Sequence, residues 1–300
     1  MPRPFAVALA LLAVYVLWGS TAPAIKVAVE TIPPWWMAGL RFALAGAVLW
    51  TWSRARGLAL PTRSEFGFAA LTGIVLLVIG NGIFAWALQY LPSGIGALFF
   101  ALAPVFMAIF AFAFYRERLS RPAVVGVCVG LAGMIYLYSP SGAQHLPAYP
   151  TILGALSSIA WAAGSVLQRR SRGSNVVQIS ALQMLVASGV LVAMALASGE
   201  RLSAAAFTPK ATAALLYLVV FGSIIGFSAF LWLLNNVPTT LASTYSYVNP
   251  IVSLALGIGM LHEPFSWPLA AGAGVIVVGV AVMILAPQPT VMTTSGAPLR

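Results

Sequence analysis

Amphipathic side chains in the middle of long apolar stretches are the residues of this 300-residue sequence whose types and positions could do chemistry. The aromatic members are Trp18, Phe84, Phe99, Trp161, Tyr245 and Tyr247, and the polar members are Ser20, Asn81, Ser165 and Asn249. Rings offer stacking surfaces, while hydroxyl and amide groups offer hydrogen bonds, and cavities for small amphipathic ligands combine the two. The alternative is that the rings pack against lipid or neighbouring helices.

Ionisable groups are scarce in these stretches. The sequence has no Asp, and its five acidic residues, Glu30, Glu65, Glu117, Glu200 and Glu263, fall at loops or helix ends, as do both His residues. Ser20 and Ser165 therefore lack a base that could activate them as nucleophiles. We expect no enzyme, no metal site and no cofactor. Because a proton relay needs an embedded carboxylate or His, we also expect no strong coupling to protons.

Two cations could contact a ligand. Arg41 lies about seven residues inside an apolar stretch, where an unpaired charge costs ~2.5–3.5 kcal/mol at full depth. It would either meet a carboxylate or, as the favoured alternative, snorkel or bind backbone carbonyls toward the outer surface. Lys26 is expected to anchor a helix end, with a guard at the exit as the alternative. So few charges suit a zwitterion or neutral solute better than a phosphate-bearing one.

Two prolines fall near the middle of apolar stretches at matching depths. Pro104 and Pro250 lack an N–H, so they free the carbonyls of Phe100 and Ser246 and favour a kink. The freed carbonyls could receive an ammonium group and the kinks could act as hinges. The alternative is that the prolines only shape the helices for packing.

Composition places the chain in a membrane. With 61% hydrophobic and 7% charged residues, it has more apolar surface than a water-soluble domain can bury. Spanning segments must then be helices, since lipid offers the backbone no hydrogen-bond partners. We predict ten, at residues 5–27, 34–53, 66–89, 93–115, 121–139, 149–168, 177–197, 210–235, 239–260 and 266–286. The first could be read as a signal peptide, but its length and Pro23 favour a helix that stays.

A stretch of the chain is used twice. Residues 86–138 recur as residues 232–284 with a constant shift of 146, which aligns Trp86 with Trp232 and Pro104 with Pro250. The earlier parts align more weakly, Trp18 with Trp161 at a shift of 143 and Arg41 with Gln183 at 142. We therefore predict two five-helix repeats, 1–140 and 147–287, followed by a disordered cytoplasmic tail, 288–300. An odd number of helices inverts the second repeat in the membrane.

The distribution of positive charge predicts the orientation. With the N-terminus inside, the cytoplasmic cations are Arg3, Arg54, Arg56, Arg63, Arg116, Arg118, Arg121, Arg169, Arg170, Arg172 and Arg300. Only Lys26, Arg201 and Lys210 are then outside. Positive charge near short loops stays on the cytoplasmic side, so both termini are expected there. The net charge of +10 fits this orientation and anionic headgroups, and we expect no nucleic-acid partner.

Glycines recur in the fifth and tenth predicted helices. They are Gly126, Gly130, Gly133, Gly272, Gly274 and Gly279. Small residues let helix backbones approach closely in a membrane. Contact with a second molecule is the alternative, but internal packing and a functional monomer are favoured because both repeats lie in one chain.

The chain resembles the EamA repeats of the drug/metabolite transporter superfamily over nearly its whole length, from WGSTAPAIKV to GAGVIVVGVAVMIL. The most specific part is an E-x-x-S-x-P-x-x-x-G pattern that begins at Glu117 and again at Glu263. We expect these two carboxylates to fix their turns through local Arg or backbone contacts. Within the family the chain looks most like YddG-type exporters, which implies a bacterial inner-membrane protein that moves aromatic and other neutral amino acids outward.

The resemblance and the inverted repeat together predict alternating access, because two mirrored packings of the halves open opposite sides. The expected partners are a small-molecule substrate and the lipid bilayer. Carriers of drugs, nucleotide sugars or other metabolites remain alternatives, as does a membrane scaffold without transport.

Overall fold

The computed structural model of the protein describes residues 4–116, 120–138, 146–168, 175–237, 239–242 and 244–285. Several residues used above lie outside these ranges, namely Arg3, Glu117, Arg118, His145, Arg169, Arg170, Arg172 and the tail 288–300. The side chain of Tyr247 also lies outside the described part.

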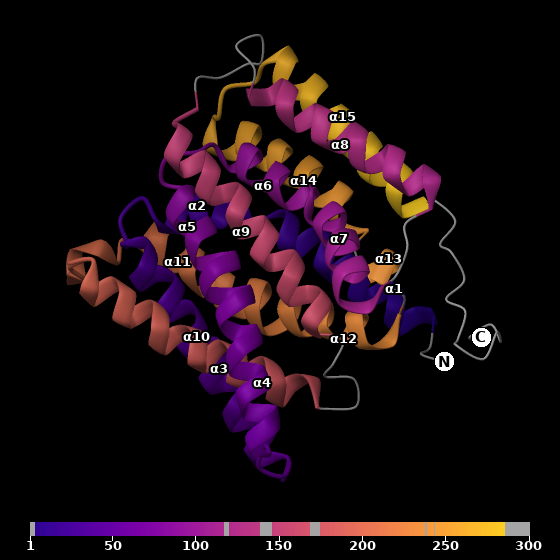
Figure 1. Cartoon of the computed structure of the whole chain (residues 1–300). Helices are drawn as coiled ribbons and strands as arrows, with labels where there is room; N and C mark the ends of the chain where they lie inside the picture. Colours follow the sequence, from indigo (N-terminus) through magenta and orange to yellow (C-terminus); the bar gives the residue numbers. More distant parts are fainter. Residues whose placement is uncertain are drawn as a thin grey trace, which may run out of the picture.

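Throughout the described ranges, every regular element is a helix. In chain order they are α1 (Pro4–Ala13), η1 (Val14–Trp18), α2 (Thr21–Ala28), α3 (Pro34–Ala55), α4 (Arg63–Gly73), η2 (Ile74–Gly82), α5 (Ile83–Ala87), α6 (Ser93–Ala101), α7 (Ala103–Tyr115), α8 (Arg121–Tyr138), α9 (Ala148–Leu167), α10 (Val176–Ala197), η4 (Ala204–Ala206), α11 (Pro209–Tyr217), η5 (Leu218–Phe227), α12 (Ser228–Asn236), α13 (Thr239–Ala242), α14 (Tyr245–Leu261) and α15 (Trp267–Leu285). Figure 1 shows their arrangement.

Helices occupy every range predicted as a span. Six continuous stretches are long and apolar enough to cross a membrane: Pro4–Ala28, Arg63–Ala87, Ser93–Tyr115, Ala148–Leu167, Val176–Ala197 and Pro209–Asn236. Shorter apolar helices lie at Arg121–Gly133, Val248–Leu261 and Trp267–Gly279. The chain is an all-helical, multi-pass membrane protein, and the total of ten crossings stays a prediction.

The helix ends follow from local chemistry. Thr62 and Glu65 form a capping box at the start of α4, with each side chain bonding the other residue's backbone amide. Asn175 accepts hydrogen bonds from two amides in the first turn of α10. Two other helices, α7 and α14, end at Arg116 and His262, which adopt the left-handed conformation with φ of 59° and 54°. These two residues are 146 positions apart, so the same helix stop occurs in both copies.

Three of the long helices contain π-helical turns, which the sequence pattern did not predict. They are η1, η2 and η5, and each lies inside a helix that is otherwise α-helical. Residues 74–82 of η2 shifted by 146 become 220–228, which overlaps η5 almost completely. The repeat therefore preserves the π-helical turn as well as the sequence. Such turns are rare and are frequently found at functional sites.

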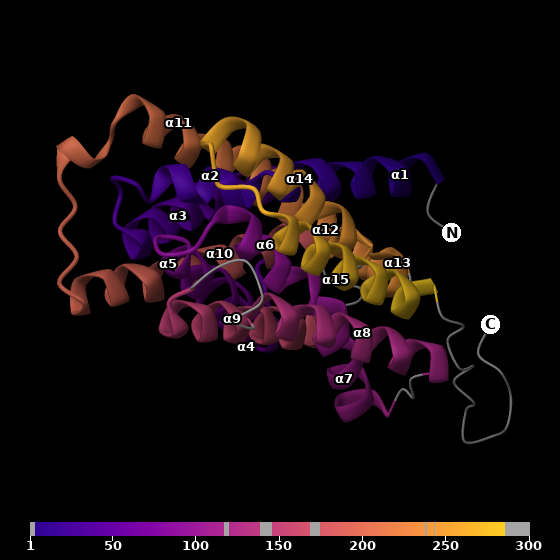
Figure 2. The same cartoon turned by 90° about the horizontal axis from the view of Figure 1, so that it is seen from above.

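Matched helices of the two copies pack against each other in antiparallel pairs, one pair at each side of the molecule in Figures 1 and 2. In the α3–α10 pair, Gly39 faces Val192 and Gly46 faces Leu185. As the number rises along α3 it falls along α10, so the helices run in opposite directions. In the α8–α15 pair, Gly133 faces Ile276. Antiparallel contact between matched helices is the arrangement that an inverted repeat requires.

The glycines of α8 and α15 serve that second pair unequally. A Cβ on Gly279 would lie 2.8 Å from the backbone oxygen of Gly126 and from the Cα of Gly130, and one on Gly133 would lie 2.9 Å from Ile276. Gly272 is buried. Gly274, by contrast, has no atom within 4 Å of such a Cβ and is exposed, so the expectation that it packs helices is corrected: it lies on the outer face of α15.

Candidate functional site

A cavity lies where the interrupted helices meet. It encloses about 640 Å³ of space without atoms, part of which is continuous with solvent. Its walls come from both copies, and the lining residues are Trp18, Thr21, Ala22, Arg41, Phe42, Leu77, Asn81, Phe84, Ala97, Phe100, Trp161, Gly222, Ser223, Phe227, Tyr245 and Asn249. All three π-helical turns contribute, η1 through Trp18, η2 through Asn81 and η5 through Ser223. Apolar and aromatic side chains with a few polar groups are the usual lining of small-molecule sites.

Aromatic rings form one wall of the cavity. Trp18 lies 5.3 Å from Trp161 and 5.4 Å from Tyr245, both edge to face, measured between ring centroids. Phe230 stacks on Trp161 at 5.7 Å behind this wall. Each indole N–H has a partner, because Trp161 donates to the Tyr245 hydroxyl and Trp18 donates to the carbonyl of Gly222, both at 3.1 Å. The rings therefore present apolar surface, while their polar atoms are bonded within the protein.

Arg41 supplies the positive charge of the cavity. Its side chain is only 3% exposed, its Nε donates to Ser223 Oγ at 2.7 Å, and its Nη1 donates to Asn81 Oδ1 at 3.3 Å. The expectation that Arg41 snorkels or binds backbone carbonyls toward the outer surface is corrected by these contacts. The polar partners of the guanidinium lie on η2 and η5, so it turns toward the cavity.

The structure does not bring every predicted residue to the cavity. Phe99 is buried in a second core cluster, where its ring packs on Gly154, and the neighbouring Phe100 lines the cavity instead. Ser20 donates to the carbonyls of Val16 and Leu17 and contacts the Tyr217 hydroxyl at 2.6 Å.

Ser165 is also kept from the cavity by a local bond. It is buried and donates to the carbonyl of Trp161, one turn earlier, at 2.8 Å. Serine in a helix commonly makes this bond to the preceding turn, which occupies the hydroxyl.

One end of the bundle is held by two charged residues far apart in the sequence. Lys26 donates to the carbonyls of Leu88 at 2.8 Å and Leu91 at 2.9 Å, where α5 has ended. Glu263 accepts from the amide of Ser93 at 2.7 Å and from its hydroxyl at 2.9 Å. A cation thus meets the carbonyl end of one helix and an anion meets the amide end of the next. Glu263 binds backbone groups, as expected, but these amides belong to the start of α6 and not to the turn that contains Glu263.

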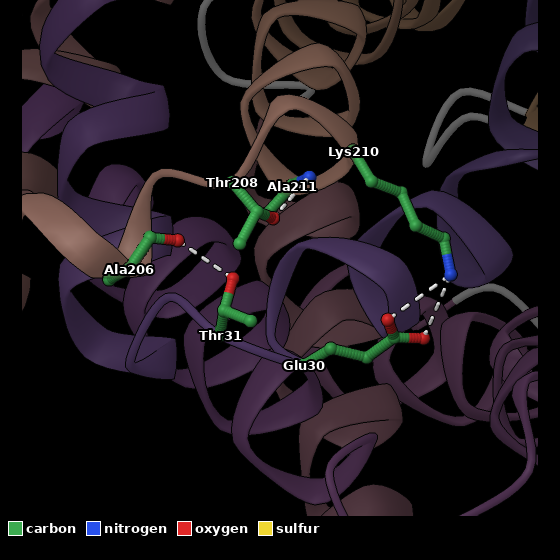
Figure 3. A network of polar contacts seen from close by, with 6 residues as sticks. All are labelled: Glu30, Thr31, Ala206, Thr208, Lys210 and Ala211. Carbon is green, nitrogen blue, oxygen red and sulfur yellow. Dashed lines mark hydrogen bonds and ion pairs between the residues drawn. The ribbon is translucent and has the colours of Figure 1, made fainter.

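The loops at the same end link the two copies (Figure 3). Lys210 pairs with Glu30 at 3.2 Å on the surface, and Thr31 donates to the carbonyl of Ala206 at 2.7 Å. Glu200 lies near the first turn of α3 and accepts from the amides of Trp35 and Trp36 at 3.4 and 3.3 Å. Burial raises the pKa of the Glu200 carboxyl, and the two amides oppose that shift.

The two prolines interrupt their helices differently. Pro104 lies in the first turn of α7, just after the break at Leu102 that separates α6 from α7. Pro250 lies inside the continuous helix α14. Phe100 lines the cavity, whereas Ser246 is buried and is not among the lining residues. Their action as hinges stays a prediction.

Several lining residues were missed from the sequence. They are Thr21, Ala22, Phe42, Leu77, Ala97, Phe100, Gly222, Ser223 and Phe227. The internal repeat contained a signal for some of them, because Leu77 and Ser223 are 146 positions apart, as are Asn81 and Phe227. Both pairs line the cavity, so adding the repeat partner of Asn81 would have found Phe227.

Known proteins resemble the chain over almost all of its length. YedA, an inner membrane transporter of Escherichia coli K12, is 39% identical over 279 residues, which cover 92% of this chain and 90% of YedA. A Salmonella typhimurium LT2 protein named "Probable amino-acid metabolite efflux pump" is 28% identical over 288 residues, with 91% of this chain and 93% of that protein covered.

A solved crystal structure shares the fold, with a TM-score of 0.70 and 23% identity over 94% of this chain and 96% of the other. The model of the EamA-like transporter family matches residues 5–139 and 149–285, one match for each copy of the repeat. The chain therefore belongs to the EamA-like transporter family, within the drug/metabolite transporter superfamily.

Proposed function

We propose that the protein exports neutral amino acids, aromatic ones in particular, across the bacterial inner membrane through the central cavity. The observation that carries this proposal is the cavity wall itself. Trp18, Trp161 and Tyr245 offer ring surfaces, and Arg41 and Asn81 lie beside them. An amino acid with an apolar side chain has a body for the rings and a charged end for the polar side. The Salmonella typhimurium relative is named a probable amino-acid metabolite efflux pump, which supports both the substrate class and the outward direction.

Alternating access is the proposed mechanism. The two copies, 1–140 and 147–287, are taken as inverted halves whose relative rocking exposes the cavity to one side and then to the other. Support comes from the antiparallel pairs α3–α10 and α8–α15 and from the cavity walls that both halves share. Both termini are proposed to lie in the cytoplasm, on the charge distribution of the loops.

Transport without strong proton coupling follows from the lining residues. No Glu or His borders the cavity in the described part of the chain, so a proton carrier at the site is missing from that wall. Ser20 and Ser165 are bonded to backbone carbonyls, and no His or carboxylate is among their hydrogen-bond partners in the described part of the chain. We therefore propose a carrier rather than an enzyme, working as a monomer, with no cofactor and no nucleic-acid partner.

Nucleotide-sugar transport is the competing function within the family resemblance. A diphosphate would call for several convergent cations, whereas Arg41 is the one Lys or Arg among the described residues that line the cavity. The observation thus favours a substrate with a single carboxylate. Other small metabolites and drugs stay as outcomes of the test.

The test is flux of radiolabelled amino acids in proteoliposomes that contain the full chain, with and without a pH gradient. We expect saturable flux of phenylalanine and of at least one other neutral amino acid, unchanged by the gradient. Protein-free liposomes and the K210Q variant, which alters an exposed surface pair, are the controls. Absence of saturable flux for every neutral amino acid would remove the substrate assignment, and flux that follows the gradient would remove the uncoupled mechanism.

A further inference from the structure

Arg41 is a buried cation whose partners in the described structure are neutral. Its guanidinium carries five N–H donors, and two of them are used, on Ser223 and Asn81. The side chain is 3% exposed and borders the cavity. Nη2 makes no hydrogen bond to the described residues, so donors remain for a further group.

The carboxylates that the structure describes are engaged away from Arg41. The sequence has no Asp. Among the described Glu residues, Glu30 pairs with Lys210, Glu65 with Thr62, Glu200 with the start of α3, and Glu263 with Ser93. Within these ranges Arg41 forms no ion pair. An uncompensated charge inside a membrane protein is costly, and such residues commonly mark substrate pathways.

At the Arg41 position, only the first copy of the internal repeat has a charged residue. The position matched to Arg41 in the second copy is Gln183, whose amide is buried and donates to Thr72 and Gln168 at 2.7 and 2.8 Å. That neutral amide uses its nitrogen to bond two other side chains. Packing at this helix position therefore works with a neutral amide, and the charge at Arg41 is additional to it.

The absence of a side chain at Gly222 leaves room for the guanidinium of Arg41. A Cβ on Gly222 would lie 2.9 Å from Nη2 of Arg41, closer than van der Waals contact allows. Glycine at this position of η5 lets the cation sit against the backbone at the cavity wall. The neighbouring Ser223 then fixes the direction of the side chain through its bond to Nε.

We propose that Arg41, Asn81 and Ser223 form a carboxylate-binding subsite, with Arg41 as the ligating cation and Ser223 as its positioning residue. In the part of the chain that the structure describes, no Glu lines the cavity, so an ammonium group meets no matching anion there. The subsite thus selects carboxylates attached to an apolar or aromatic body, and the α-amino group is dispensable. This inference rests on the proposed function only in placing the substrate in this cavity.

Four ligands that share a phenyl ring separate the two ends of an amino acid. Phenylalanine has both charges, 3-phenylpropionate has the carboxylate alone, and phenylalaninamide and phenethylamine have the ammonium alone. Binding is measured by isothermal titration calorimetry on the purified full chain in detergent. We expect the two carboxylates to bind comparably, and at least about tenfold more tightly than the two amines, as a charge-assisted contact implies.

The variants locate that preference. R41Q, which installs the residue of the matched position, should weaken both carboxylates by about ten- to a hundredfold and leave the amines unchanged. R41K should recover part of the loss, since Lys provides charge without the fork of donors. G222A keeps the charge but crowds Nη2, so it should also weaken carboxylates selectively. K210Q removes an exposed cation and should change nothing.

The outcomes distinguish this subsite from the proposed function. Amino-acid flux together with binding that R41Q leaves unchanged would overturn the subsite and keep the transporter proposal. Binding of 3-phenylpropionate that depends on Arg41, without amino-acid flux, would do the reverse. Equal losses for all four ligands would show a structural role for Arg41 and overturn the subsite, as would absence of binding by any ligand to the folded wild-type protein.

Discussion

Glu263 accepts a hydrogen bond from the amide of Ser93 at 2.7 Å although the two residues are 170 positions apart. Each comes from a different copy of the repeat. Ser93 begins α6, and α5 ends just before Leu88, so α5 and α6 form a helical hairpin. At the α5 side of this hairpin, Lys26 donates to the carbonyls of Leu88 and Leu91. The turn between α5 and α6 is therefore bound by a cation at the C-terminal end of α5 and by an anion at the N-terminal end of α6, as the helix dipoles favour.

Removing the Glu263 carboxylate should loosen this end of the bundle. In a C128S background with a cysteine introduced at Leu91, which is 1% exposed, E263A should raise the rate of maleimide labelling several-fold. The reason is that the Ser93 and Gly94 amides lose their acceptor. E65A removes a carboxylate that caps its own helix, α4, and is the control. Equal labelling rates in both variants would show that Glu263 does not hold the hairpin closed.

The indole of Trp161 contributes both ring surface and a hydrogen bond, and substitutions separate the two. W161A should abolish most flux, because a large ring is lost from the wall beside Trp18 and Phe230. W161F keeps a ring but loses the bond to the Tyr245 hydroxyl, so a smaller loss is expected.

A double-mutant cycle with Y245F tests that bond directly. If the hydrogen bond is the shared interaction, W161F and Y245F together should cost less than the sum of the two single effects on thermal stability, by about 0.6 kcal/mol for a typical bond between membrane helices. Additive losses would mean that the indole and the hydroxyl act independently.

The α8–α15 contact provides a matched pair of glycines. G279A places a methyl group 2.8 Å from the backbone of Gly126 and Gly130, which should destabilise the protein by about 1–3 kcal/mol. G274A introduces the same atom on an open face and should stay within about 0.5 kcal/mol of the wild type. Unfolding in detergent measures both. Similar midpoints for the two variants would contradict the antiparallel contact described above.

Glu200 makes stability depend on pH in a defined direction. Burial raises its pKa above the ordinary 4.5, so the folded protein holds this proton more tightly than the unfolded chain does. Stability contributed by this group is therefore fully present below pH 4.5 and falls as pH rises from there through the raised pKa. E200Q removes that dependence while keeping an acceptor for Trp35 and Trp36. Unfolding midpoints that fall equally with pH in both proteins would assign the effect to other groups.

Helix positions were accessible from the sequence because apolar length and flanking Pro or charged residues determine where a span can start and stop. Thus α6 begins at the predicted residue 93, and α15 lies within the predicted 266–286. The side chains that face the cavity were harder to predict. Phe99 and Phe100 are adjacent and identical in type, so only the local rotation of α6 decides which one lines the wall.

Arg41 shows a second reason why cavity-lining side chains were harder to predict than helix positions. Its sequence neighbours allow an outward or an inward side chain, and the choice depends on Ser223, which is 182 positions away. Local propensity contains no information about such a partner. The repeat contained some, since Leu77 and Ser223 are matched residues and both line the cavity.

The extra residue in each π-helical turn has a consequence for how the chain can be altered. Deleting one residue from η2 or η5 would let that wide turn return to ordinary helical winding and would change the direction in which the side chains of the turn face. Asn81 lies near the end of η2, so a deletion earlier in that turn would swing its amide away from the guanidinium. The protein would keep its spans and its hydrophobicity and lose the alignment of one wall with the other.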